Sequence, residues 1–93
     1  MSHELNGRLR RRDGILAQEA RGQTVLLRLD DGSYYALDEV GALIWELCDG
    51  ERSLAEVVDE LCSQFDAPED TVAADVLEFV NDLRREQLLV DDD

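Results

Sequence analysis

Residues 24–48, TVLLRLDDGSYYALDEVGALIWELC, decide the fold of this chain because two different hydrophobic periods meet within them. As far as Leu37 the pattern has a period of two, which is typical of half-buried β-strands. After Asp38 the apolar residues recur every three or four positions, which is typical of an amphipathic helix. The chain is therefore expected to change from strand to helix at Asp38, whose side chain suits a helix N-cap.

The strand-like part of the sequence extends back to residue 15. Residues 15–20, 24–29 and 33–37 each have the pattern of a strand, and short turn signals separate them. Asp30-Asp31-Gly32 is a strong hairpin signal because glycine adopts the positive φ that a tight turn requires. We expect a three-stranded antiparallel meander whose last strand, residues 33–37, lies at a sheet edge.

Three helices are predicted after the meander. The first begins after Asp38 and ends at Asp49-Gly50, where glycine takes the usual stop position. The second begins at Ser53–Glu56, a capping box of the form Ser-x-x-Glu. The third runs from about Pro68 to Glu86, and proline suits its first turn. The sequence thus predicts an α+β fold, a three-stranded antiparallel β-meander followed by three helices, in a winged-helix-like order.

The predicted domain covers residues 15–90. Residues 1–14 contain four arginines and no hydrophobic period, so we expect a flexible N-terminal lead-in there. Residues 88–90 are apolar and are expected to pack back on the core, and residues 91–93 are expected to form an acidic tail. The chain shows neither the features of a secretion signal nor an apolar run of about 18 residues, so we expect a cytoplasmic protein.

Charge is distributed unevenly along the chain. The net charge is −14, there is no lysine, and residues 38–93 carry 18 acidic residues against three arginines. A field of this sign repels the phosphate backbone of nucleic acids, whose binding depends on Lys and Arg. It also repels anionic membrane surfaces. We therefore expect neither nucleic acid nor membrane as a partner.

No set of catalytic residues is apparent in the sequence. The only histidine, His3, falls in the predicted lead-in, and no glycine-rich phosphate-binding motif is present. Cys48 and Cys62 lie too far apart for a metal clip and fall on apolar helix stripes, so we interpret both as small buried hydrophobes. Trp45 is interpreted as a core residue, in preference to an anchor for a partner enzyme. The sequence predicts no enzyme, no catalytic or metal-binding residues and no cofactor.

Two features point to recognition. The strand at 33–37 contains neither charge nor proline, the usual means of blunting an open sheet edge. An extended peptide can dock on such an edge as an additional strand. The third helix carries a wide apolar band, with Ala73 and Leu77 on its flank. Either the whole band belongs to the core, or part of it faces the edge strand and forms a groove with it.

The sequence resembles the PqqD family over about residues 15–90. The resemblance is carried by Gly32–Ala42, Ile44-Trp45, Asp49-Gly50, Ser53, Ala73–Val76 and the closing Leu83-x4-Leu88-Leu89. It implies three strands followed by three helices, and a role in making ribosomally produced, modified peptides. Members bind the leader segment of a precursor peptide and present it to a modifying enzyme, often a radical SAM enzyme, or to a leader protease.

The resemblance also implies a binding site. In the family the leader adds as a strand against the third strand and packs on the third helix. Carried onto this sequence, the peptide-binding residues are Ser33, Tyr34, Tyr35, Ala36, Leu37, Val72, Val76, Phe79, Val80 and Leu83. Which face of the strand lines the groove stays open at this point, as does homodimerisation through the free edge.

Two alternatives belong to other classes of protein. One is an adaptor that binds a folded partner protein without any peptide. The other is a winged-helix DNA-binding protein, which is disfavoured because Asp75, Glu78 and Asp82 lie on the helix that would enter a groove of the duplex.

Overall fold

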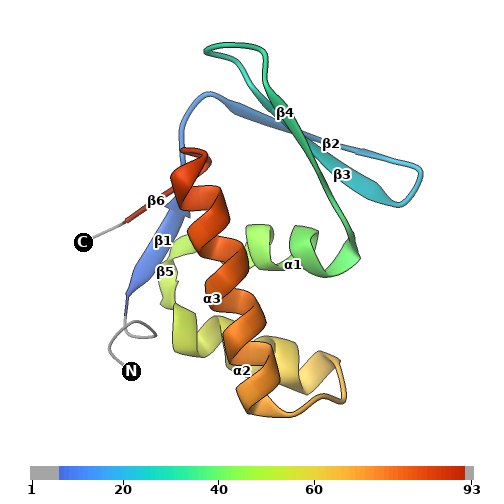
Figure 1. Cartoon of the computed structure of the whole chain (residues 1–93), viewed down its shortest axis with the longest axis vertical. Helices are drawn as coiled ribbons and strands as arrows, with labels where there is room; N and C mark the ends of the chain where they lie inside the picture. The colour runs from blue at the N-terminus through green and yellow to red at the C-terminus, as the bar shows by residue number, and fades with distance from the viewer. Residues whose placement is uncertain (1–6, 92–93) are drawn as a thin grey trace.

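The computed structural model describes residues 7–91. In this part of the chain, three helices lie below and beside two small antiparallel sheets (Figure 1). The elements in chain order are β1 (Arg8–Arg11), β2 (Ile15–Ala20), β3 (Gln23–Arg28), β4 (Tyr34–Leu37), α1 (Glu39–Leu47), β5 (Asp49–Ser53), α2 (Leu54–Gln64), α3 (Glu69–Arg85) and β6 (Leu89–Asp91).

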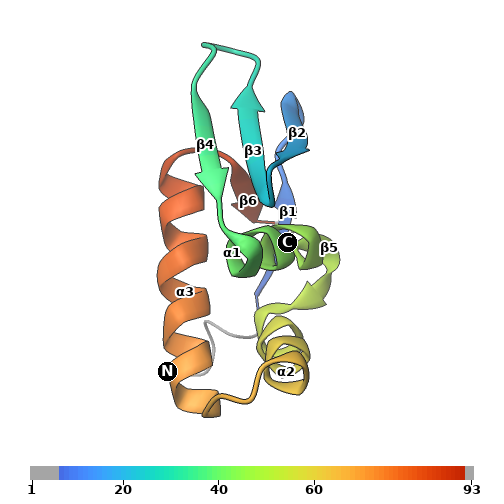
Figure 2. The ribbon, with the colours of Figure 1, turned by 90° about the vertical axis from the view of Figure 1, so that its right-hand side faces the viewer.

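The predicted meander is confirmed as the sheet β2-β3-β4. All neighbouring strands are antiparallel, with Leu16 opposite Leu27 and Leu27 opposite Tyr34. The turns that join them use glycine at positive φ, 79° at Gly22 and 78° at Gly32. Figure 2 shows this sheet as a wing that projects beyond the helices, with β4 leading directly into α1.

A second sheet, with the strand order β5-β1-β6, was not predicted. Its central strand β1 occupies residues 8–11, so the prediction of a flexible lead-in over residues 1–14 is wrong for these four residues. β1 is held by antiparallel pairing on both sides, and Leu9 is only 2% exposed. Strand β6 contains Leu89 and Val90 of the segment that was predicted to return to the core, and it also includes Asp91 of the expected acidic tail. His3 lies outside the described residues.

The helix starts follow the local signals in the sequence. Asp38 caps α1, because its carboxylate accepts a hydrogen bond from the Gly41 N–H at 2.8 Å. The capping box of α2 is also confirmed, with reciprocal hydrogen bonds between Ser53 and Glu56 at 3.2 and 2.8 Å. Helix α1 ends before Asp49, as predicted, but Cys48 is its C-cap and Asp49-Gly50 already belongs to strand β5, so glycine does not take the stop position.

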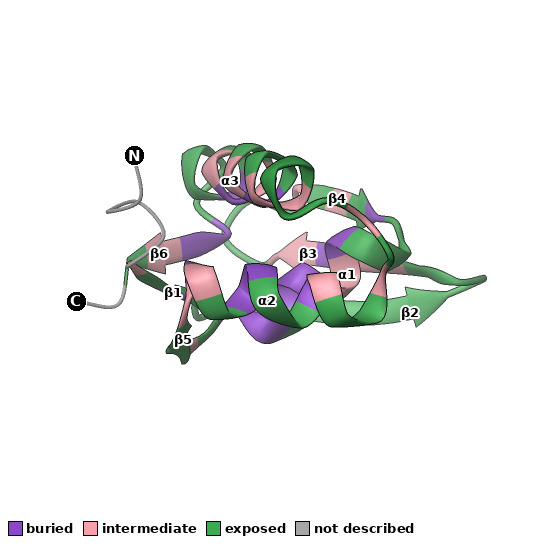
Figure 3. Cartoon of the chain, turned by 90° about the horizontal axis from the view of Figure 1, so that it is seen from below, coloured by how far each residue is buried: buried purple, intermediate pink, exposed green. Residues whose placement is uncertain are grey.

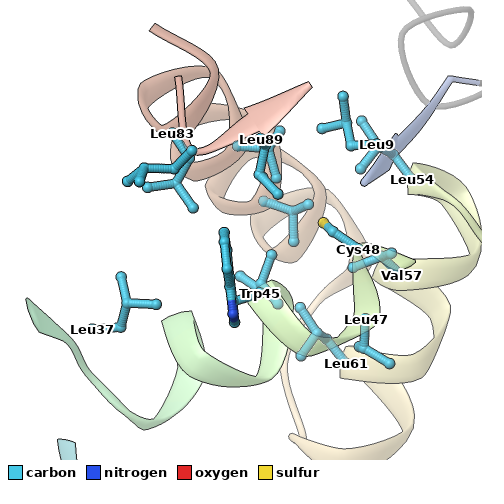
Figure 4. Close-up of a cluster of buried hydrophobic side chains, with 14 of the residues drawn as sticks. Leu9, Leu37, Trp45, Leu47, Cys48, Leu54, Val57, Leu61, Leu83 and Leu89 are labelled. Atoms are coloured by element: carbon cyan, nitrogen blue, oxygen red, sulfur yellow. The ribbon is translucent and has the colours of Figure 1, made fainter. Parts of the chain in front are cut away.

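One hydrophobic core joins both sheets to the helices. Trp45 of α1 and Cys48, which directly follows this helix, are both buried in the core, as their interpretation from the sequence required (Figure 4). Leu88 and Leu89 are buried as well, which confirms that the segment after α3 packs back on the core. Seen from below, the buried residues gather on the facing sides of the helices, while the outer faces of α2 and α3 are exposed (Figure 3).

The burial of Leu9 generates a test of strand β1. Leu9→Ala is expected to lower the free energy of unfolding by about 2–5 kcal/mol, because it leaves a cavity in the core. The same substitution at Leu29, which is 61% exposed, is expected to cost no more than about 0.5 kcal/mol. Urea unfolding followed by tryptophan fluorescence measures both, and equal costs at the two positions would contradict the placement of β1.

Candidate functional site

The outer edge of β4 is open, because no other strand in residues 7–91 pairs with it. The Arg28 N–H donates to the Ser33 carbonyl at 2.7 Å, and these two residues continue the register of β3 with β4. Hydrogen-bonding direction alternates along an antiparallel pair. Tyr35 and Leu37 therefore direct their backbone groups toward β3, whereas Tyr34 and Ala36 direct theirs toward the open edge.

The side chains of β4 alternate between the two faces of the wing. Leu37 is 5% exposed and Tyr35 is half-buried, whereas Tyr34 is 73% exposed. Tyr35 lies opposite Leu26, which is fully buried in the core. The face of Tyr35 and Leu37 is thus the one that meets the helices, which answers the question that the sequence left open.

A groove runs between the edge of β4 and helix α3, which lie along the same side of the molecule (Figure 3). It consists of two adjoining cavities of about 510 and 320 Å³. Both are lined by Ala36 and Leu37 of β4 and by Phe79 and Asp82 of α3. The larger cavity extends to the first turn of α1, and the smaller one extends past Tyr35 to the end of α3.

The structure places only part of the predicted binding residues in the groove. The groove brings together Tyr35, Ala36, Leu37, Phe79 and Leu83. Val76 and Val80 are fully buried in the core. Val72 lines a further apolar cavity, which adjoins the larger one because both are lined by Val40, Ile44 and Asp75. Tyr34 lies on the outer face of the wing, and Ser33 lies in the turn before β4. Of the apolar band on α3, Phe79 is the residue that is half-buried and faces the groove.

The first turn of α1 forms a wall of the groove that the sequence analysis missed. Val40, Gly41 and Ile44 line the larger cavity. A Cβ atom on Gly41 would lie 3.1 Å from two ring atoms of Phe79, so glycine permits the helix to approach the ring this closely. A glycine inside a helix lowers the stability of the helix by up to about 1 kcal/mol relative to alanine. The presence of glycine at position 41 is therefore the signal in the sequence that indicates a close contact.

Polar contacts hold the wing against the end of α3. The Tyr35 hydroxyl donates a hydrogen bond to the Glu86 carboxylate, and the Arg28 guanidinium donates to the Glu86 carbonyl. The hydrogen bond to Glu86, with partial burial, raises the pKa of Tyr35 above its ordinary value. Arg28 also pairs with Asp31, and this pairing lowers the pKa of the Asp31 carboxyl. The ring of Tyr35 is therefore fixed at one end of the groove.

The groove is lined mainly by apolar side chains and carboxylates. Within the described range, no three His, Cys, Asp or Glu side chains are placed to hold a metal ion. Cys48 is buried, and desolvation raises the pKa of its thiol to about 12, which disfavours the reactive thiolate. No helix in residues 7–91 has the length and apolar character needed to cross a membrane. The arrangement offers an open strand edge and an apolar floor, which suit the docking of an extended chain.

Comparison with known proteins yields one family and a consistent fold. The family described as coenzyme PQQ synthesis protein D (PqqD) matches residues 23–89. The PqqA binding protein of Xanthomonas axonopodis pv. citri is 32% identical over 78 residues, which are 84% of this chain and 85% of the relative. That of Rhizobium meliloti is 38% identical over 69 residues, which are 74% of this chain and 68% of the relative.

Two solved structures have a similar fold. TbiB1 in complex with the TbiA(beta) leader peptide is 31% identical and has a TM-score of 0.78, with 86% of this chain and 93% of that chain covered. Lasso peptide synthetase B1 complexed with the leader peptide is 24% identical and has a TM-score of 0.80, with 88% and 96% covered.

The two thiols generate a test of the interpretation that both are packing residues. Cys62 is half-buried and Cys48 is fully buried, and burial raises the pKa of each. In the native protein at pH 8, a thiol reagent is expected to modify Cys62 first and to leave Cys48 unmodified until the protein unfolds. Mass spectrometry of the labelled peptides with and without urea checks this order. Rapid modification of native Cys48 would contradict it.

Proposed function

Because the chain belongs to the PqqD family, we propose that it binds the leader segment of a ribosomally made precursor peptide by strand addition. The observation that carries this proposal is the open edge of β4 beside the apolar groove at Phe79. The bound leader is then presented to a peptide-modifying enzyme, such as a radical SAM enzyme, or to a leader protease. The relatives named as PqqA binding proteins and the two leader-peptide complexes support this function.

Backbone hydrogen bonds supply the part of the binding that does not depend on the leader sequence. Tyr34 and Ala36 each direct one N–H and one C=O toward the open edge. A leader in the extended conformation satisfies these groups as a fourth strand of the wing. Because glycine turns and core packing already hold β4 in place, the protein loses little conformational freedom on binding.

Side chains supply the sequence preference. Alternate residues of an added strand point to the same face, about 7 Å apart. Those that point inward meet the ring of Phe79 and the side chain of Leu83. The cavities are of the size that accepts side chains rather than a folded domain, so we expect apolar leader residues at alternate positions.

The proposed role is binding without catalysis, cofactor or metal. It is supported by the buried, high-pKa thiol of Cys48 and by the apolar floor of the groove. We further propose that the protein works in the cytoplasm, where the free thiols of Cys48 and Cys62 remain reduced.

The first test removes a backbone donor from the open edge. Ala36→Pro is expected to weaken leader binding at least about tenfold, because the Ala36 N–H points away from β3 and the substitution spares the ladder. Ala17→Pro is the matched control, since Ala17 lies on the opposite edge strand and directs its N–H outward in the same way. Titration of the labelled precursor and of its leaderless core measures both. Unchanged binding in Ala36→Pro would overturn strand addition at β4.

The second test charges the apolar floor. Phe79→Glu is expected to weaken leader binding at least about tenfold, because docking would then desolvate a carboxylate. Leu77→Glu is the matched control, because Leu77 is also half-buried on α3 but lies outside the groove. Circular dichroism establishes that both variants are folded. Equal losses of affinity in the two variants would show that the Phe79 face is merely part of the packing.

A further inference from the structure

The charges along the groove are arranged unevenly. At the end beside α1, Asp75 and Glu78 line the larger cavity. Across residues 7–91, neither carboxylate makes an ion pair or a side-chain hydrogen bond. At the other end the acids are partnered, because Asp82 pairs with Arg85 and Glu86 accepts from Tyr35. Uncompensated negative charge is therefore concentrated beside Leu37 and the start of α1.

Several arginines are engaged elsewhere in the fold, and Arg21, in the turn before Gln23, does not line the larger cavity. Arg12 pairs with Asp30, Arg52 with Asp49 and Arg84 with Asp91. Arg11 donates to the carbonyls that end α1. The described residues that line the larger cavity include four carboxylates and no arginine. No arginine side chain lines this cavity, so a cation that contacts the carboxylates inside it is expected from the bound partner.

The acids have a spacing that an extended peptide can follow. Asp75, Glu78 and Asp82 lie at i, i+3 and i+7, so they form one stripe on α3. The stripe is roughly 10 Å long at about 1.5 Å per residue. Inward-pointing side chains of an added strand recur about every 7 Å. One or two side chains of a docked peptide therefore lie opposite this stripe.

We propose that the leader segment docked beside Leu37 carries one or two basic residues, arginine or lysine, two positions along the strand from the apolar residue that contacts Phe79. This inference rests on the proposed function and specifies its substrate class. A peptide without a cation would partly desolvate Asp75 and Glu78 without compensation, and an acidic peptide would be repelled. A second copy of this chain fits the edge poorly, because each copy carries a net charge of −14 and contains no lysine.

The acids select among peptides more than they add affinity. Ion pairs between exposed side chains typically change an equilibrium only severalfold and weaken as salt is added. Backbone pairing at β4 and apolar contact with Phe79 therefore remain the basis of binding. The carboxylates raise the association rate of basic leaders and exclude acidic ones.

The test is a selection from a displayed library of random peptides. It is run on three proteins. One is the unaltered chain. The groove variant combines Asp75→Asn with Glu78→Gln, and the control variant combines Asp59→Asn with Glu46→Gln. The control removes the same charge from exposed positions outside the groove. The unaltered chain and the control are expected to enrich arginine or lysine two positions from an apolar residue, and the groove variant is expected to lose the basic preference. Equal basic content in all three selections would overturn the inference.

A titration then localises the effect. The most enriched peptide is expected to bind the groove variant about threefold to tenfold more weakly than the control at low salt. Replacing its basic residue by glutamine should weaken binding to the unaltered chain, but not to the groove variant. A direct contact would be contradicted if the change in the peptide and the change in the groove each reduced the binding free energy independently, so that their effects added.

The same peptides distinguish this inference from the proposed function. Peptides that lose affinity for Ala36→Pro but show no basic preference would leave strand addition standing and overturn the charge contact. Peptides that bind Ala36→Pro as tightly as the unaltered chain would overturn the proposed function, and the inference with it.

Discussion

The burial of Leu26 and Leu37 beneath the wing is the constraint on which the rest of the structure depends. Side chains of a strand alternate between faces, so the burial of these two residues fixes the inward face of both β3 and β4. A slip of one residue in the register would carry both leucines into solvent, at a cost that the small core cannot absorb. The same register decides which backbone groups face the open edge and where Tyr35 meets Glu86.

Helix α3 serves the core and the groove with neighbouring residues. Val76, Val80 and Leu83 face inward and hold the helix against the sheets, whereas Phe79 is rotated from that stripe and remains half-buried at the rim. The contact of its ring with Gly41 ties the floor of the groove to the first turn of α1. The groove is thus built on packed helices and not on loops, which favours a preformed site.

Much of the fold could be predicted from local signals in the sequence. The cap at Asp38, the capping box at Ser53 and the glycine turns each specify backbone geometry within a few residues, and the structure confirms them. Strand β1 could not be predicted, because one buried leucine among arginines gives no period and its partners are distant in sequence. The site was located only in part. A helical stripe does not distinguish Val80, which is buried, from Phe79, which lines the groove.

The two sheets differ in the order in which the chain can complete them. The wing pairs segments that follow one another directly, whereas β1 pairs with β5 and, through Leu9 opposite Asp91, with β6. Pairing across such separations forms slowly, because the loop between the partners must first close. β1 is translated before the other strands, yet its sheet cannot close until residues 89–91 have left the ribosome. During that interval its backbone edge and Leu9 are exposed to other chains, so the nascent protein is prone to aggregation until β6 has emerged.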